Sequence, residues 1–168
     1  MINNDRILLL EEELLLVRHS GEIPEVALHG SLHYLCEDPE GPGLILADEE
    51  LRPLQEAALT RYQEIIRRDL DIDNRDLSVF RGIGRAISNW DRYQRFSEGI
   101  GYAVEEFRRE AATSLLAYLQ QEAAEVSCGA RAPSVDCPAT ELLIFARTLG
   151  LAARDLPTGW DALCVRSS

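Results

Sequence analysis

Apolar residues recur every three or four positions through most of the chain, which is the spacing of one face of an α-helix. The pattern predicts helices over residues 51–70, 77–96, 100–126 and 138–149, followed by a last short helix around Trp160 and Leu163. Pro53 suits the first turn of the helix that contains it. Between these helices, runs of Asp, Gly, Ser and Pro predict loops or breaks.

The first fifty residues have a different pattern. Leu- and Glu-rich sequence predicts a helix from Asp5 to His19, and a second helix is expected over Pro24–Glu37. In the first of these helices Leu9 and Leu16 face away from four other apolar residues, so the helix has two apolar sides. These four are Ile7, Leu10, Leu14 and Val17. Such a helix either runs through the middle of a bundle or offers one side to a second copy of the chain. The sequence therefore predicts a homodimer that forms through this helix.

Five or six helices joined by short loops indicate an all-α bundle. No internal repeat is visible, and a chain of 168 residues usually forms one domain. The expected architecture is a compact bundle of five or six helices that makes up a single helical domain over residues 1–168. An apolar content of 46% excludes a disordered chain.

Targeting signals and membrane spans are not expected. The apolar run at Ile7–Leu10 stops at three glutamates, which is too short for a secretory signal. No stretch approaches the roughly 18 apolar residues of a spanning helix. The sequence therefore predicts a soluble cytoplasmic protein whose four cysteines are reduced thiols.

Charge is distributed unevenly along the chain. The net charge is −12, and all 17 basic residues are arginine. Residues 1–50 contain 12 acidic residues and 2 arginines, whereas residues 75–95 contain 5 arginines and 2 acidic residues. An acidic chain is a poor general ligand for nucleic acid, because phosphate binding needs positive surface.

The most distinctive candidate site is a line of arginines on the predicted helix 77–96. At 100° per residue, all its members fall within about 40° of Arg81. This arginine row consists of Arg81, Arg85, Ser88, Arg92 and Arg95. Guanidinium groups bind carboxylates and phosphates through paired hydrogen bonds, so the row predicts a site for an anion or an acidic partner segment. The alternative is that the row pairs with the protein's own acidic residues.

A second candidate is a pair of histidines in the predicted helix 24–37. His29 and His33 are four residues apart, so both imidazoles can reach one divalent metal ion. Glu25, Cys36 or Glu37 would supply a further ligand. Ordinary surface or capping histidines are the alternative, and no cofactor is otherwise expected.

Asp69, Asp71 and Asp73 resemble the start of a calcium-binding loop, but Asn74 and Phe80 stand where that loop needs Gly and Glu. Helix capping and turn formation explain these aspartates better. The sequence has no Cys-x-x-Cys pair, phosphate loop, nucleophile elbow or zinc-protease motif.

The function expected from the sequence is a non-enzymatic accessory or regulatory module. It would bind an acidic partner segment or a small anion through the arginine row. Two alternatives remain open: a metal-dependent helical protein that uses His29 and His33, and a chaperone-like bundle. The chaperone-like bundle would need an exposed apolar groove lined by Trp90, Tyr93 or Trp160.

Overall fold

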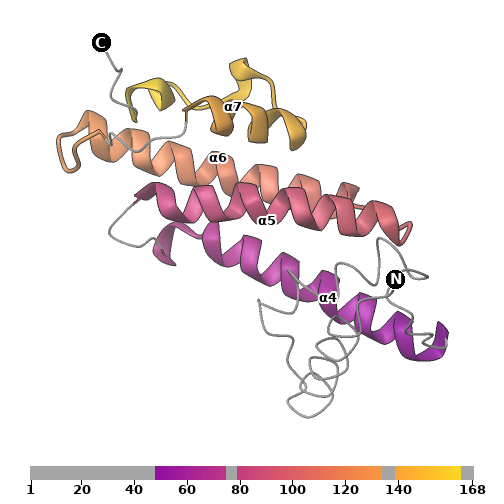
Figure 1. The fold of residues 1–168 in the computed structure, drawn as a ribbon. Coiled ribbons are helices and arrows are strands. Elements are labelled where there is room, and N and C mark those ends of the chain that lie inside the picture. The colour runs from indigo at the N-terminus through magenta and orange to yellow at the C-terminus, as the bar shows by residue number, and fades with distance from the viewer. Residues whose placement is uncertain (1–47, 75–78, 134–138, 164–168) are drawn as a thin grey trace, which may run out of the picture. The chain divides into compact units, whose positions relative to one another are not determined.

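The computed structural model describes residues 48–74, 79–133 and 139–163. This part of the chain is helical and contains no strand. Figure 1 shows its four α-helices in chain order: α4 (Asp48–Asp69), α5 (Val79–Gly99), α6 (Glu105–Ser127) and α7 (Ala139–Thr148). Three short 3-10 helices accompany them: η1 (Ile72–Asn74), η2 (Ala153–Asp155) and η3 (Trp160–Leu163).

The chain divides into two compact units, and α4 and α5 each contribute to both. The first unit combines residues 1–64 with 92–103, and the second combines 65–91 with 104–168. In the described part of the first unit, α4 and α5 contact each other through aromatic side chains. Tyr62 packs edge-on against Tyr93, with ring centroids 6.4 Å apart, and also contacts Phe96. Gln63 donates a hydrogen bond to the Tyr93 hydroxyl at 3.1 Å.

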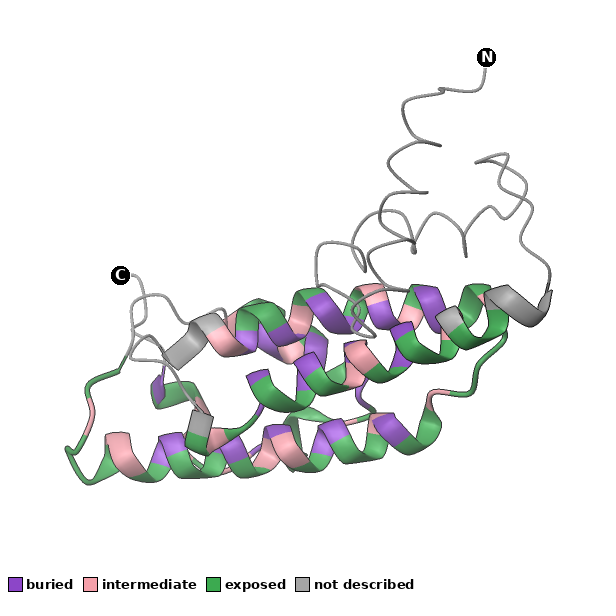
Figure 2. Cartoon of the chain, turned by 90° about the horizontal axis from the view of Figure 1, so that it is seen from below, coloured by how far each residue is buried: buried purple, intermediate pink, exposed green. Residues whose placement is uncertain are grey.

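The second unit has its own core, built around Trp90. The Trp90 ring stacks on Phe107 of α6 at 5.9 Å between centroids and meets Phe145 of α7 at 6.3 Å. Trp90 therefore joins α5, α6 and α7 within one apolar layer. Figure 2 shows the buried positions recurring along one side of each helix, as an amphipathic helix requires.

The prediction of a helical fold is confirmed for the described part of the chain, which has four α-helices in place of the five or six expected for the whole. The expected last helix around Trp160 and Leu163 is a single 3-10 turn, η3. The predicted helices 5–19 and 24–37 lie outside the described residues, as does the two-sided apolar surface that predicted the homodimer.

Two predicted helix boundaries also differ. The helix containing Pro53 begins at Asp48, so the proline lies inside the helix and past its first turn. The helix expected from residue 100 begins at Glu105. Gly101 adopts a left-handed φ of +68°, which separates α5 from α6 and leaves Ile100 outside both helices.

No described helix has both the length and the hydropathy needed to cross a membrane.

Candidate functional site

Two arginines from different helices meet at one buried carboxylate in the second unit. Asp69, the last residue of α4, has a side chain that is only 1% exposed. Its Oδ1 accepts hydrogen bonds from Nε and Nη2 of Arg68, each at 3.1 Å. Nη2 of Arg85, on α5, lies 3.3 Å from the same oxygen. We call Arg68, Asp69 and Arg85 the Asp69 cluster.

The Asp69 cluster has an excess of one positive charge, and its two cations reach the surface. The side chains of Arg68 and Arg85 are 43% and 47% exposed, although the carboxylate that holds them is buried. Their two Nη2 atoms are at most 6.4 Å apart, because they lie 3.1 and 3.3 Å from one oxygen. A single oxyanion at the surface can therefore accept hydrogen bonds from both side chains.

The second oxygen of Asp69 differs from the first. Oδ2 is buried and has no hydrogen-bond partner in the structure. A buried acceptor without a partner costs on the order of 1–3 kcal/mol, so the Oδ2 atom does not add to the stability that Oδ1 gains from its two arginines.

Gly82 explains how Arg85 reaches Asp69. A Cβ atom at Gly82 would lie 2.9 Å from the backbone oxygen of Asp69, closer than real Cβ contacts allow. The first turn of α5 therefore packs directly against the end of α4 because residue 82 has no side chain. The glycine in Arg81-Gly-Ile-Gly-Arg85 thus has a packing role. Gly84 has no atom within 4 Å of the corresponding position.

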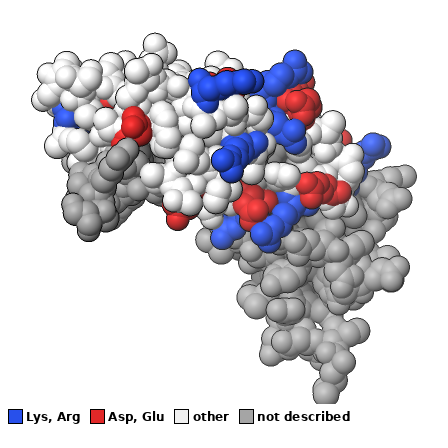
Figure 3. Space-filling view, turned by 90° about the horizontal axis from the view of Figure 1, so that it is seen from above, with Lys and Arg blue, Asp and Glu red and all other residues white. Residues whose placement is uncertain are grey.

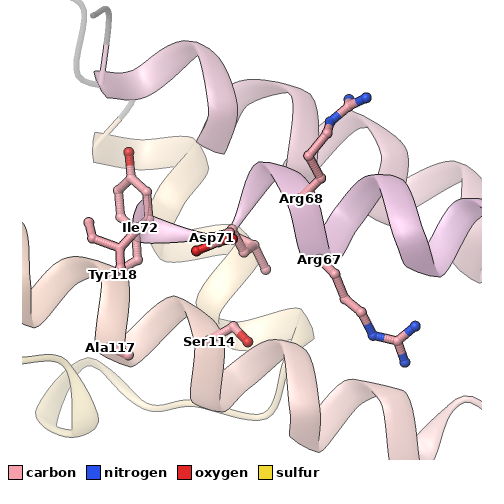
Figure 4. A pocket seen from close by; sticks show the side chains of 8 residues that line it. Arg67, Arg68, Asp71, Ile72, Ser114, Ala117 and Tyr118 are labelled. Atoms are coloured by element: carbon pink, nitrogen blue, oxygen red, sulfur yellow. The ribbon is translucent and has the colours of Figure 1, made fainter. Parts of the chain in front are cut away.

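A pocket of about 360 Å³ lies next to the Asp69 cluster, between the end of α4, η1 and α6. We call it the α4–α6 pocket, and Figure 4 shows the side chains that line it. Its wall contains Arg67, Arg68, Leu70, Asp71, Ile72, Ser114, Ala117 and Tyr118. Arg68 belongs to both the pocket wall and the Asp69 cluster.

Arg67 is paired differently from Arg68. Its Nη2 donates to Oε2 of Glu110 at 2.9 Å and its Nε donates to Oε1, so one guanidinium matches one carboxylate. This hydrogen bonding holds the pKa of Glu110 below its ordinary value. The Arg67 guanidinium also lies 5.0 Å from the centroid of the Phe107 ring.

A second buried carboxylate lies near the C-terminal end of α6. Glu122 is also 1% exposed, and both of its oxygens accept from Nη1 of Arg131, at 2.7 and 2.9 Å. The pair ties the turn after α6 back to the helix. A groove of about 730 Å³ between α6 and residues 155–162 is lined largely by small residues, among them Ala123, Ala124 and Gly159.

The structure distributes the arginine row between different environments. Arg85 pairs with Asp69, so part of the row does face the protein's own acidic residues. Ser88 and Arg95 are exposed, and Arg92 is half-buried. Arg95 has an interaction of its own. Arg81 lies in α5, but its side chain is not among those described.

Figure 3 shows that arginine and acidic side chains lie next to one another on the face in view. The described ion pairs include Arg61–Glu64 and Arg108–Glu105 as well as those above. In each of these pairs one arginine meets one acidic residue, whereas the Asp69 cluster has two arginines and one aspartate.

Other predicted residues have mixed outcomes. His29, His33, Glu25, Cys36 and Glu37 lie outside the described residues. Within the described part, no group of three or more His, Cys, Asp or Glu side chains is arranged to hold a metal ion.

The turn expected at the aspartate run is present, because Asp71 Oδ1 accepts from the backbone N–H of Asp73 at 3.0 Å. The apolar groove expected for a chaperone-like bundle does not form from Trp90 and Tyr93. Both are core residues, at 2% and 0% exposure, and Trp160 is half-buried.

Comparison with known proteins identifies a family. Residues 5–151 match the family model described as "Repeat of unknown function (DUF7826)". The chain belongs to this family. The DUF7826 match takes in α4 to α7, and with them the Asp69 cluster, the α4–α6 pocket and the Glu122–Arg131 pair. No curated protein and no solved structure matches the chain.

Two members of the Asp69 cluster were missed by the sequence analysis. Arg68 lies on a different helix from the arginine row, and Asp69 was assigned to capping and turn formation. One signal was available: an acidic side chain at the last residue of a helix opposes the helix dipole, so such a residue needs a positive partner.

Proposed function

We propose that this DUF7826 chain is a non-enzymatic accessory or regulatory module that binds an oxyanion at Arg85 of the arginine row on α5, together with Arg68 at the end of α4. The oxyanion is carried by an acidic partner segment or by a small anion. The observation that supports this best is the Asp69 cluster, where Arg68 and Arg85 share one carboxylate oxygen and remain nearly half exposed.

The arrangement lowers the cost of binding. An arginine side chain loses conformational freedom when it grips a ligand, and that loss weakens binding. Arg68 and Arg85 are already held by Asp69, so less freedom remains to be lost. The excess positive charge of the cluster adds attraction for an anion.

Binding can be measured by calorimetry, with inorganic phosphate and a hexaglutamate peptide as two separate probes on the full chain. We expect at least one probe to bind, and we expect Arg85→Met to weaken that binding about tenfold or more, as for the loss of a charge-assisted hydrogen bond. Tighter binding of the peptide would favour an acidic partner segment, and tighter binding of phosphate a small anion.

Arg147→Met is the matched control, because Arg147 is an exposed arginine of α7 that does not belong to the Asp69 cluster. Arg92→Met reports whether the binding surface continues along the predicted arginine row. If neither probe binds, or if Arg147→Met weakens binding as much as Arg85→Met, the proposal is wrong.

A further inference from the structure

The outer side of α7 carries an apolar side chain that the fold leaves uncovered. Leu142, Phe145 and Ala146 are buried, and Phe145 meets Trp90 in the core of the second unit. Ile144 is 55% exposed and, at 100° per residue, lies on the opposite side of the helix. A single exposed apolar residue is common on protein surfaces, so the residues around Ile144 decide what it can bind.

Opposite charges flank Ile144 at equal distances along α7. Glu141 precedes it by three residues and Arg147 follows it by three, and both are exposed. Residues spaced by three form a straight ridge that is inclined about 45° to the helix axis. We call Glu141, Ile144 and Arg147 the α7 ridge. From one end to the other, this ridge is acidic, apolar and basic.

The two charges of the α7 ridge are not matched within the described part of the chain. Glu141 and Arg147 are too far apart to pair with each other, because side chains of one helix meet at a spacing of three or four residues. Neither forms an ion pair with another described residue. Both charges are therefore available to a partner.

The α7 ridge is complementary to itself. A second copy, rotated by 180° about an axis at Ile144, presents the same ridge in reverse order. Ile144 then meets Ile144 of the second copy, and Glu141 of each copy faces Arg147 of the other, as a twofold interface requires. The remaining neighbours of Ile144 are Thr140 and Thr148, which are exposed and short enough to let the helices approach. Because the ridges are inclined, the two helices cross steeply.

We propose that two copies of this chain form a dimer through the α7 ridge. A partner of this ridge must present an apolar residue between opposite charges in reverse order, and a second copy does so by symmetry. The helix has only 10 residues, so the contact is small and the dimer is weak. The inference goes beyond the proposed function and is independent of it, since the α7 ridge shares no residue with the Asp69 cluster.

Sedimentation of the full chain from about 10 µM to about 1 mM measures the dissociation constant of this dimer. We expect the average mass to rise with concentration toward that of two chains. Ile144→Arg brings two like charges face to face at the centre of the contact and should weaken the dimer about tenfold or more. Tyr102→Arg is the matched control, because Tyr102 is 49% exposed and lies outside α7, and it should leave the dissociation constant unchanged.

Charge reversal tests the pairing itself. Glu141→Arg and Arg147→Glu each replace two attractive contacts of the dimer with two repulsive ones, so each variant alone should dimerise about tenfold more weakly. An equimolar mixture of the two variants should associate again, because the basic ridge of one meets the acidic ridge of the other. The variant that carries both changes should regain the natural dissociation constant to within about threefold.

Thermal unfolding of each variant checks that it is folded. A chain that stays monomeric over the whole concentration range would overturn the inference. A dimer that Ile144→Arg leaves intact would also overturn it, because that dimer forms through another surface, such as the predicted helix 5–19. If the charge-reversed variants fail to associate when mixed, the pairing of Glu141 with Arg147 is wrong. None of these outcomes bears on anion binding at the Asp69 cluster.

Discussion

Asp69 and Glu122 are both buried carboxylates paired with arginine, but they are paired in opposite ways. Both side chains are 1% exposed. Glu122 uses both oxygens to bind one arginine, Arg131, whose side chain is 23% exposed. Asp69 uses one oxygen to hold two arginines that are nearly half exposed, and its other oxygen has no partner.

The difference separates a structural ion pair from a candidate binding site. At Glu122 the charges balance and the hydrogen-bonding groups are used within the protein, so the pair fastens a turn to α6. At Asp69 one positive charge remains, and guanidinium N–H groups point to the surface. The proposed function assigns the two exposed arginines at Asp69, and not the Glu122–Arg131 pair, to ligand binding.

The largest expected effect is at Arg131. Arg131→Met leaves Glu122 buried without its guanidinium and should lower the free energy of unfolding by about 3 kcal/mol. Arg85→Met should lower it by only about 1 kcal/mol, because Arg68 still pairs with Asp69. Urea unfolding of both variants measures the difference, and equal losses would contradict the distinction between the two carboxylates.

The close approach of α4 and α5 gives the next effect. Gly82→Ala forces a Cβ atom against the backbone oxygen of Asp69 and should destabilise the protein by about 2 kcal/mol. Gly84→Ala, in the same helix but in open space, should stabilise it by about 0.5–1 kcal/mol. Thermal unfolding of the two variants tests whether α5 packs directly against α4 at Gly82. Equal changes in stability for Gly82→Ala and Gly84→Ala would contradict that contact.

Amide substitutions compare the two carboxylates directly. Glu122→Gln places an NH₂ group where an oxygen accepts from Arg131, so we expect a loss of about 2 kcal/mol. Asp69→Asn can place its NH₂ group where Oδ2 has no partner, so the loss should be below about 1 kcal/mol. The free energy of unfolding of both variants is measured by chemical unfolding. A larger loss for Asp69→Asn than for Glu122→Gln would contradict the view that Glu122 forms the structural ion pair.

The exposed Arg67–Glu110 pair should contribute least, at most about 1 kcal/mol. Arg67 lowers the pKa of Glu110 from its ordinary value of 4.5, so the pair stabilises the fold above that pH. The contribution is lost as the pH falls through the lowered pKa. The stability difference between the natural chain and Glu110→Gln should therefore be larger at pH 6 than at pH 3, and a difference independent of pH would exclude this coupling.

Helical periodicity was sufficient to predict α4 to α7, because amphipathic helices bury one regular face. It was not sufficient for the boundaries, since apolar spacing placed Ile100 in the following helix, whereas the left-handed Gly101 closes the turn that ends α5. Arg85 of the candidate site was predicted from its place on a helix face. Arg68 and Asp69 were not, because their convergence with Arg85 depends on how tightly α5 approaches α4 at Gly82, which is a tertiary contact.

The most direct measurement of the central claim is an NMR titration of arginine side-chain Nε–H signals with phosphate and, separately, propionate. Arg68, Arg85 and Arg131 signals are assigned by the corresponding Met variants. The account predicts that the Arg68 and Arg85 signals shift together and saturate, while the Arg131 signal, held by Glu122, does not move. Shifts that are equal at all exposed arginines, or absent at Arg68 and Arg85, would contradict it.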